Sequence, residues 1–436
     1  MSEKSHRIAF QTFGCKLNFA ETSTIARQFR EDGYEVVEHR DLADIYVINS
    51  CVVTSNAEKK CKAAIRQAKR RNPDARVAVV GCFSQMKDAE LAAMEEVDLV
   101  IGNEEKFMLK SYLREGALPG ACHSHVGDIN RSDFFAPSWS SGDRTRSFLK
   151  VQDGCDYFCT FCTIPFARGR SRSATIAETI ASAREIAGTG MKEIILTGVN
   201  IGDFGKPHGE SFFSLIQELD KVEGIERIRI SSIEPDLLNE DIIQFIATSE
   251  KFLPHFHIPL QSGSDKVLQA MKRKYPREIF AKRVKEIKKH MPAACVAADV
   301  IIGFPGETDE DFRETYQFLE NLDIAYMHVF TYSERPGTRA AGMENKVSSK
   351  TKRERSKLLH DLSDRKKDKF YNSNVGNEVS VLFESDNNGG YMHGFSENYL
   401  KVKTIFREDL INSIVKVMLG KPEADGCFNY RREDRQ

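Results

Sequence analysis

Three cysteines at short, fixed intervals constrain the fold of this chain more than any other feature. Cys155, Cys159 and Cys162 follow one another in the pattern C-x3-C-x2-C. Thiolates at such intervals are typical of iron–sulfur clusters. Three ligands on a four-iron cluster leave one iron free to bind a substrate or a cofactor. A zinc site is the alternative, but zinc usually takes four ligands in paired spacings, and no fourth Cys or His lies nearby in the sequence.

The aromatic residue before the last of these cysteines, Phe161, adds a second signal. A triplet with an aromatic residue at this place resembles the signature of the radical S-adenosylmethionine (SAM) superfamily. The resemblance implies that the open iron binds SAM, with Phe161 at the cofactor. It also implies that an electron from the cluster cleaves SAM to a radical that removes hydrogen from the substrate.

Composition narrows the class of protein. A length of 436 residues predicts two or three domains, and a net charge of −1 indicates that any RNA affinity comes from local patches. The first residues, Met1 to Arg7, are polar, and the sequence has no long apolar run. We therefore expect no signal peptide and no membrane span. Ten cysteines without such a signal indicate reduced thiols, so we expect a cytoplasmic protein.

Residues 1–115 alternate short apolar runs with amphipathic stretches, which predicts an open α/β domain with a parallel sheet. A cysteine closes each of the three strands expected at 7–12, 45–48 and 77–80: these are Cys15, Cys51 and Cys82. Ligands bind at the carboxyl ends of such strands, so the three thiols can converge on a second cluster. They can equally be small buried residues. The isolated cysteines are expected not to be ligands: Cys61, Cys122, Cys295 and Cys427.

Residues 116–140 are rich in Gly, Ser, Asp and Arg and are expected to form a linker. Residues 147–335 then repeat strand and helix, which favours a (β/α)6 partial barrel with its chemistry on the loops after the strands. The strands are expected at about 147–151, 193–197, 227–231, 256–260, 298–302 and 326–331.

Small and polar residues follow these strands, as a cofactor pocket requires, although ordinary turns have the same composition. The candidates for binding SAM are Thr197, Asn200, Ser231, Glu234, Gly303 and Pro305. Directly after the cysteine triplet come Arg168, Arg170 and Arg172. Three alternate arginines can contact the phosphates of RNA, or they can form a solvated loop.

Residues 374–436 change character again, with short β-like runs separated by turns. About sixty such residues predict a small antiparallel β-barrel of the OB type, a common scaffold for RNA binding. A structural cap without a ligand is the alternative.

Throughout its length the chain resembles the tRNA and ribosomal-protein methylthiotransferases. The matching motifs are Thr12-Phe13-Gly14-Cys15-Lys16-Leu17-Asn18, Asn49-Ser50-Cys51, Gly81-Cys82-Phe83-Ser84-Gln85 and Asp153-Gly154-Cys155 through Arg172. The resemblance implies an N-terminal cluster domain, a radical SAM core and a C-terminal TRAM module. Short motifs favour the type that acts on N6-threonylcarbamoyladenosine in tRNA: Gly14-Cys15-Lys16-Leu17-Asn18, Ile164-Pro165-Phe166-Ala167-Arg168 through Arg172, and Ser231-Ser232-Ile233-Glu234-Pro235.

This resemblance implies two [4Fe–4S] clusters, one on Cys155, Cys159 and Cys162 and an auxiliary one on Cys15, Cys51 and Cys82. It implies that SAM serves as methyl source and as radical source, and that a methylthio group joins C2 of the modified adenine beside the anticodon. An electron donor such as flavodoxin or ferredoxin and a sulfur donor are then needed. The alternatives are isopentenyladenosine in tRNA or a ribosomal protein as substrate, and a non-catalytic RNA-binding protein with a structural metal.

Overall fold

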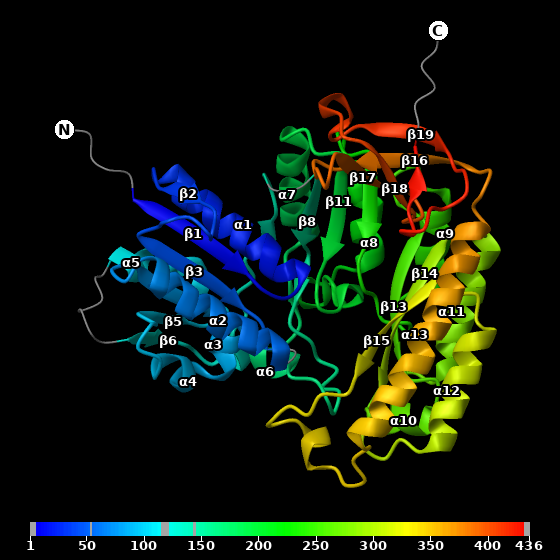
Figure 1. The fold of residues 1–436 in the computed structure, drawn as a ribbon, viewed down its shortest axis with the longest axis horizontal. Coiled ribbons are helices and arrows are strands. Elements are labelled where there is room, and N and C mark those ends of the chain that lie inside the picture. Colours follow the sequence, from blue (N-terminus) through cyan, green and yellow to red (C-terminus); the bar gives the residue numbers. More distant parts are fainter. Residues whose placement is uncertain (1–5, 53–54, 115–121, 143–144, 431–436) are drawn as a thin grey trace.

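The computed structural model describes residues 6–52, 55–114, 122–142 and 145–430. Along the chain it forms an α/β unit, a half-barrel of strands and helices, and a curled C-terminal sheet (Figure 1). Among the described residues, no helix combines the length and the apolar composition that a membrane span requires.

The N-terminal unit is a six-stranded parallel sheet in the order β2-β1-β3-β4-β5-β6. Neighbouring residues of one strand belong to different apolar clusters: Val47 packs with one and Ile48 with the other, so both faces of the sheet are covered. The strands are β1 Arg7–Thr12, β2 Glu35–Val37, β3 Ile45–Ser50, β4 Arg76–Gly81, β5 Leu99–Ile101 and β6 His123–His125. The helices are α1 Lys16–Glu31, α2 Ser55–Arg71, α3 Cys82–Met86, α4 Asp88–Ala92 and α5 Leu109–Arg114.

The central unit is a (β/α)6 half-barrel. Its strands form two hydrogen-bonded sheets, and parallel bridges from Ile228 to Phe252 and from Ser232 to His257 join them. The strands are β8 Arg146–Lys150, β11 Glu193–Thr197, β12 Arg227–Ile230, β13 His255–Gln261, β14 Cys295–Ile302 and β15 Tyr326–Thr331. The covering helices are α7 Ile176–Gly188, α8 Phe212–Asp220, α9 Glu240–Thr248, α11 Arg277–His290, α12 Asp309–Asn321 and α13 Ser349–Asn372.

The C-terminal unit is a five-stranded sheet in the order β19-β16-β17-β18-β20. It is antiparallel except for β20, which pairs in parallel with β18. The strands are β16 Glu378–Phe383, β17 Tyr391–Ser396, β18 Lys401–Ile405, β19 Ile414–Met418 and β20 Phe428–Asn429. In its described residues the sheet is curled and has two edges, β19 and β20.

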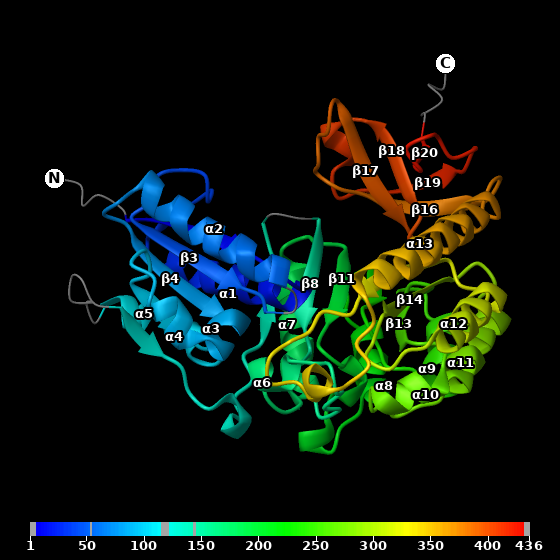
Figure 2. The ribbon, with the colours of Figure 1, turned by 60° about the horizontal axis from the view of Figure 1, so that its bottom comes forward.

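This C-terminal sheet covers the end of the half-barrel at which the strands begin (Figure 2). Cys295, the first residue of β14, shares an apolar core with Val381 of β16 and with Tyr371 of α13. Arg146, at the start of β8, forms an ion pair with Glu384 at 2.7 Å. The opposite end of the half-barrel, where the strands end, remains available for a functional site.

The segment expected to be a linker contributes strands of its own. β6 extends the N-terminal sheet, and β7 (Ser138–Trp139) pairs antiparallel with β8. Residues 116–121 of the expected linker lie outside the described residues. The three-residue strands β2, β5 and β6 escaped prediction because they are too short to show a period.

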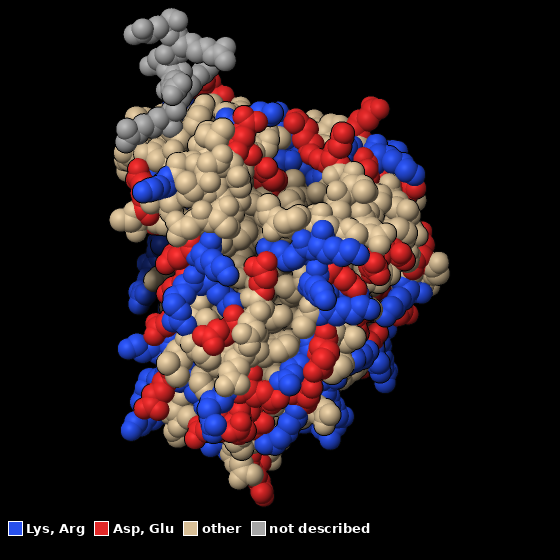
Figure 3. All heavy atoms as spheres, turned by 90° about the vertical axis from the view of Figure 1, so that its right-hand side faces the viewer, with Lys and Arg blue, Asp and Glu red and all other residues tan. Residues whose placement is uncertain are grey.

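Basic and acidic side chains alternate over the face formed by α11, α12 and α13 and by the C-terminal sheet (Figure 3). Neither sign of charge covers this face alone, which agrees with the net charge of −1. A uniform field that attracts nucleic acid is therefore absent from the described part of this face.

Candidate functional site

The Cys155–Cys162 loop follows β8 and is shaped by its backbone. Gly154 has a φ of +71°, and a Cβ at this position would lie 1.9 Å from the carbonyl oxygen of Arg170, so only glycine fits. The Cys155 amide donates to the carbonyl of Gly169 at 3.1 Å, and the Thr160 amide donates to Met271 at 3.1 Å. These bonds fix the loop at the end of the half-barrel where the strands end.

All three thiols of this loop receive hydrogen bonds. The amide of Tyr157 donates to Cys155 Sγ and the amide of Ile164 donates to Cys162 Sγ, each at 3.4 Å. Arg273 Nη1 donates to Cys159 Sγ at 3.1 Å. Donors of this kind stabilise thiolate rather than thiol, as metal ligation requires.

Without a cation, these thiols resist ionisation. Burial raises the pKa of Cys155 and of Cys162 to about 12, and the neighbouring thiols of the loop act in the same direction. The Cys162 amide donates to the Cys159 carbonyl at 3.0 Å, so the loop turns back on itself and keeps these residues together. Three clustered sulfurs with aligned donors fit a positively charged iron–sulfur cluster, which would turn the thiols into thiolates.

A second set of cysteines meets at the strand ends of the N-terminal sheet. Cys15 is the N-cap of α1, Cys51 follows β3, and Cys82 begins α3 after β4. A Cβ on Gly14 would lie 2.9 Å from Cys51 Cβ, so the turn before Cys15 packs directly on Cys51. Cys15 is exposed, but the surrounding protein atoms still raise the pKa of its thiol by desolvation, and Cys82 raises this pKa further. The three strand ends thus converge, as open α/β sheets predict.

The four remaining cysteines lie apart from these two groups. Cys61 of α2 and Cys295 of β14 are buried in apolar cores, and Cys427 packs beside β20. Cys122 is partly buried next to β6. The pKa of Cys61 is raised to about 12, chiefly by burial and further by the neighbouring Cys51.

The two cysteine groups face each other across the boundary between the N-terminal sheet and the half-barrel. Cys82 of α3 packs with Ala167 of α6 (Ile164–Arg168), the short helix after the Cys155–Cys162 loop. Asn103 Nδ2 donates to the Ala167 carbonyl at 2.6 Å and approaches Cys82 Sγ at 3.6 Å. A single compact site is therefore built from two units of the fold.

A buried ion network joins these units. Glu21 of α1 is fully buried and accepts from Lys106 at 2.6 Å, Lys150 at 2.8 Å and Arg168 at 3.1 Å. Asp153 accepts from Arg168 at 2.8 Å and from Lys150 at 2.7 Å. Burial alone would raise the pKa of Glu21, but the three cations lower it well below its usual range, so the carboxylate stays ionised.

The structure corrects the expectation that Arg168, Arg170 and Arg172 contact RNA together. Arg168 is 1% exposed and Arg172 is 7% exposed, because both form hydrogen bonds or ion pairs inside the protein. Only Arg170 points outward, where it lies 3.6 Å from Asp156 and over the Phe158 ring. Ion pairing with Asp153 overrides the solvent exposure that arginine usually prefers.

The candidate SAM residues lie at the strand ends around the Cys155–Cys162 loop. Thr197 Oγ1 and Asn200 Oδ1 are buried without a hydrogen-bond partner among the described residues, so both are available to a ligand. Glu234 is already paired with Arg273, and Phe161 packs edge-on against Phe304. The remaining candidates also lie at strand ends: Ser231 follows β12, and Gly303 and Pro305 follow β14.

Several residues of the site carried no signal that we recognised in the sequence. They are Glu21, Asn103, Lys106, Lys150, Gln261 and Arg273, whereas Asn18 and Asp153 lie in the matching motifs but had no predicted role. Lys150 and Asp153 flank the buried strand end before Cys155, and such charges beside an apolar run signal an internal ion pair. Gln261 is the last residue of β13, at the same end of the half-barrel, and its Oε1 has no partner among the described residues.

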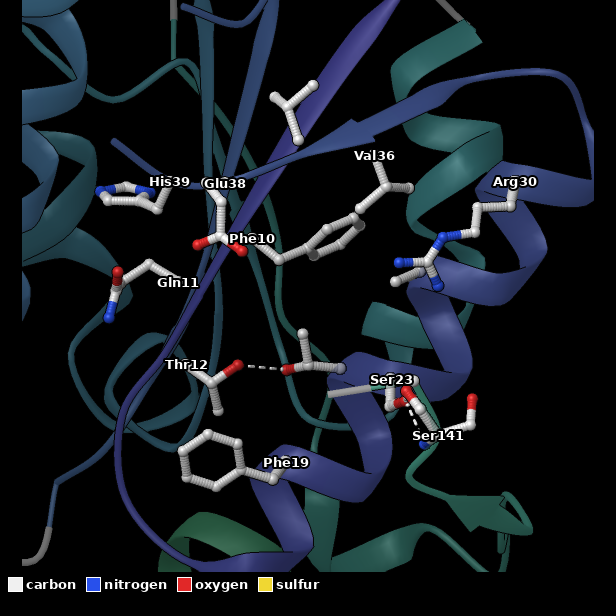
Figure 4. A pocket seen from close by; sticks show the side chains of 14 residues that line it. Phe10, Gln11, Thr12, Phe19, Ser23, Arg30, Val36, Glu38, His39 and Ser141 are labelled. Carbon is white, nitrogen blue, oxygen red and sulfur yellow. Dashed lines mark hydrogen bonds between the residues drawn. The ribbon is translucent and has the colours of Figure 1, made fainter. Parts of the chain in front are cut away.

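A pocket of about 610 Å³ opens on the outer side of the N-terminal unit. Phe10 and Thr12 of β1, Phe19 and Arg30 of α1, and Ser141 point into it (Figure 4). Neither cysteine group lines it, so it is separate from the thiol site.

Comparisons with known proteins agree with this layout. A model of the radical SAM superfamily matches residues 149–319, and a model described as "Uncharacterized protein family UPF0004" matches residues 7–102. Threonylcarbamoyladenosine tRNA methylthiotransferase MtaB of Aquifex aeolicus (strain VF5) is 40% identical over 95% of this chain and 100% of its own length. A tRNA-2-methylthio-N(6)-dimethylallyladenosine synthase of Clostridium tetani (strain Massachusetts / E88) is 32% identical over 96% of this chain and 95% of its own.

Among solved structures, the radical SAM methyltransferase TsrM of Kitasatospora setae, with cobalamin and a [4Fe-4S] cluster bound, is similar in fold. Its TM-score is 0.56 at 15% identity, over 78% of this chain and 77% of that chain. This likeness supports the arrangement of an N-terminal α/β unit beside a half-barrel.

Proposed function

We propose that this chain, which belongs to the radical SAM methylthiotransferase family, transfers a methylthio group to C2 of N6-threonylcarbamoyladenosine beside the anticodon of tRNA. The observation that carries the proposal is the meeting of two cysteine groups at one end of the half-barrel, in a chain similar over nearly its full length to an enzyme named for this substrate. A C–H bond of an aromatic ring has no useful acidity, which favours radical chemistry over a base.

We assign one [4Fe–4S] cluster to Cys155, Cys159 and Cys162 and a second to Cys15, Cys51 and Cys82. When bound, these clusters and SAM supply the electron, the hydrogen-abstracting radical, the sulfur and the methyl group. Six thiolates add much negative charge to a buried site. The buried cations Lys106, Lys150 and Arg168 outnumber the carboxylates that pair with them, so they can offset this charge.

The chain's own residues hold the site together. Arg273 donates to Cys159 Sγ and pairs with Glu234, which orders the loop against the next strand end. Glu21 links α1 to α6 through Arg168, so the two cysteine groups keep a constant separation. We assign Phe161, Thr197, Asn200, Ser231, Glu234, Gly303 and Pro305 to the surroundings of SAM.

The outer parts of the chain serve the RNA. Residues 374–436 correspond to the TRAM module of the family, and we assign it, with Arg170, to tRNA binding. Residues 1–115 form the auxiliary cluster domain, 116–140 the connection and 141–371 the radical SAM core. An electron donor of the flavodoxin or ferredoxin class and a separate sulfur donor complete the system, which we place in the cytoplasm.

The test is an anaerobic incubation of the reconstituted protein with SAM, sulfide, reductant and tRNA that carries threonylcarbamoyladenosine. Mass spectrometry of the digested nucleosides should reveal the methylthio derivative of this nucleoside. Methylthiolation of dimethylallyladenosine alone would overturn the substrate and keep the reaction. Cleavage of SAM without any change in tRNA would redirect the search to ribosomal proteins.

A further inference from the structure

Three ring-bearing side chains follow one another along the inner face of β15, the last strand of the half-barrel. Met327 and Val329 pack in or against the large apolar core between strands and helices, so their alternate neighbours point to the barrel interior. These neighbours are Tyr326, His328 and Phe330. The ring centroids of Tyr326 and His328 lie 5.4 Å apart, and those of His328 and Phe330 lie 6.5 Å apart. We call these three side chains the β15 aromatic row.

Two members of the β15 aromatic row are open to solvent. Phe330 is 50% exposed, and the side chain of His328 is 48% exposed. Among the described residues β15 pairs only with β14, so no further strand continues the wall beside the row. His328 Nδ1 lies 3.1 Å from Asp299 Oδ1, a contact that holds the imidazole in place. Exposed rings on a concave strand surface are typical platforms on which unpaired nucleobases stack.

A pocket of about 340 Å³ opens at the end of this row that is nearest the C-terminal sheet. Tyr326 and His328 of the row line it, together with Lys367 of α13 and with Tyr399 and Lys401 of the C-terminal unit. The chain has 64 acidic and 63 basic residues, yet no Asp or Glu is among the described residues that line this pocket. The pocket is therefore aromatic and positively charged, and it lies at the boundary between the half-barrel and the C-terminal sheet.

The two lysines of the pocket are free to bind an anion. Neither Lys367 nor Lys401 has an ion-pair partner among the described residues, whereas the neighbouring Lys403 pairs with Glu423 at 2.8 Å. Lys367 Nζ lies 5.5 Å from the centre of the Tyr371 ring, which attracts the cation but leaves its charge unneutralised. Free ammonium groups beside aromatic rings fit a ligand that is both aromatic and anionic. A nucleotide combines these two properties.

The other end of the β15 aromatic row leads to the Cys155–Cys162 loop. Tyr332, directly after β15, packs edge-on against Phe304 at 5.6 Å, and Phe304 packs edge-on against Phe161 at 6.5 Å. Phe161 is the residue before Cys162. At about 3.3 Å a residue, the 6 residues of β15 cover about 17 Å. The row thus connects the pocket beside the C-terminal sheet with the thiol loop at which we place the reaction.

We propose that the β15 aromatic row and its pocket bind the single-stranded nucleotides beside the reacting nucleoside of tRNA. One base enters the pocket, and Lys367 and Lys401 bind its phosphate. The inference rests on the proposed function and adds the surface that holds the RNA next to the site. A nucleoside that leaves its stack to reach the thiol loop also deprives its neighbours of a stacking partner. Rings on β15 replace that partner, and the two lysines fix the strand that carries the bases.

The test pairs changes in the RNA with changes in the protein. Anticodon stem-loops that carry threonylcarbamoyladenosine are made with one abasic nucleotide at each other loop position in turn. Binding to the cluster-loaded protein with SAM is measured by fluorescence anisotropy. We expect the wild type to lose about fivefold to a hundredfold in affinity when a base is removed at one to three positions next to the modified nucleoside. If every abasic RNA binds as tightly as the intact one, no base is bound and the proposal is wrong.

Variants of Phe330 assign the stacking to the row. Phe330→Leu keeps an apolar side chain without a ring, so at one of the sensitive positions it should bind intact and abasic RNA equally. Phe330→Tyr keeps the ring and should retain the wild-type ratio at every position. Because each variant is judged by a ratio of two affinities, a general loss of binding does not hide the result. If Phe330→Leu shows the wild-type ratio at every position, the row does not stack the bases.

Variants of the two lysines test the phosphate contact. Lys367→Gln and Lys401→Gln should each lower the slope of log Kd against log salt concentration by about 0.7, the value for one phosphate of a single strand. Lys350→Gln, at an exposed position at the other end of α13, is the matched control and should keep the wild-type slope. Wild-type slopes in both pocket variants would show that the pocket binds no phosphate.

The two proposals fail in different ways. If the wild type methylthiolates none of these RNAs while it still cleaves SAM, the proposed function is wrong. If the wild type modifies the intact RNA while Phe330→Leu and both lysine variants bind RNA as the wild type does, only the role of β15 and its pocket is wrong. The iron content of each variant should equal that of the wild type, since every assigned cluster ligand stays in place.

Discussion

The two cysteine groups reach the same site by different routes. Cys155, Cys159 and Cys162 belong to one loop, which a few backbone hydrogen bonds and one glycine hold in shape. Cys15, Cys51 and Cys82 come from three strand ends and meet only when the N-terminal sheet has formed. We call these the local group and the assembled group. The comparison teaches that sequence spacing can encode a site directly or only through tertiary structure, so the two groups should respond differently to perturbation.

The largest effects should separate the groups by function. Cys155→Ala should abolish SAM cleavage and methylthiolation together, because a cluster held by only two of its three thiolates is not retained. Cys15→Ala should spare SAM cleavage and abolish sulfur insertion. The measurement is 5′-deoxyadenosine formation beside nucleoside mass spectrometry. Cys295→Ala, in the apolar core, is the control for a lost thiol. Full SAM cleavage by Cys155→Ala would refute the local assignment.

The next largest effect should be a loss of iron from the assembled group only. Glu21→Gln leaves Lys106, Lys150 and Arg168 without a shared anion in a fully buried site. Loss of one partner from such a network costs about 3 to 5 kcal/mol of the free energy of unfolding. We expect iron bound by the assembled group to fall while the local group still cleaves SAM.

Urea unfolding and iron analysis test this expectation. Glu218→Gln removes an exposed carboxylate from α8 and should change the free energy of unfolding by less than about 0.5 kcal/mol. If Glu21→Gln is as stable as this control, the network does not hold the two units together.

A smaller effect should appear at a partly buried carboxylate in the interior of the half-barrel. Burial would raise the pKa of Asp299, but its hydrogen bonds with His257 and His328 lower it to about 2. Because the pKa of Asp299 is lower in the folded than in the unfolded protein, its carboxylate stabilises the folded state. This contribution is complete above the unfolded pKa near 3.9 and is lost as pH falls toward about 2. Asp299→Asn should therefore cost about 1 to 2 kcal/mol at pH 7 and flatten the loss of stability between about pH 4 and pH 2.

Unfolding midpoints at several pH values check this prediction. Asp323→Asn, whose side chain is 72% exposed, should keep the wild-type pH dependence. If Asp299→Asn loses stability between about pH 4 and pH 2 as steeply as the wild type, the histidine contacts do not stabilise the fold.

The smallest effect concerns RNA. Arg170→Gln should weaken tRNA binding about two- to fivefold and lower the salt dependence by about one counterion, because an exposed arginine contributes one phosphate contact. Arg168→Gln should act instead through the assembled group, with loss of iron. Anisotropy titrations over a range of salt concentrations distinguish the two. A normal salt slope in Arg170→Gln would exclude this contact.

Much of the fold was predictable because apolar residues recur at a regular spacing in the alternating strands and helices. The expected strand at 193–197 matches β11, and that at 227–231 overlaps β12. The burial of Arg168 was not predictable, since an arginine in a loop normally faces solvent. Its partner Glu21 is remote along the chain, and its partner Asp153 lies directly before Gly154 and Cys155. Only the packing of the two units brings both carboxylates within hydrogen-bond distance of Arg168.

The sequence by itself determined the local group, the repeat of strands and helices and the order of the three units, because these depend on spacing and period along the chain. The tertiary structure decided that Cys15, Cys51 and Cys82 meet, that Arg168 turns inward, and that α1 packs against β8 through Ala20 and Phe148. These outcomes depend on which faces pack together. Burying a charge is favourable only where an opposite charge from another segment arrives at the same place, and local sequence does not record that meeting.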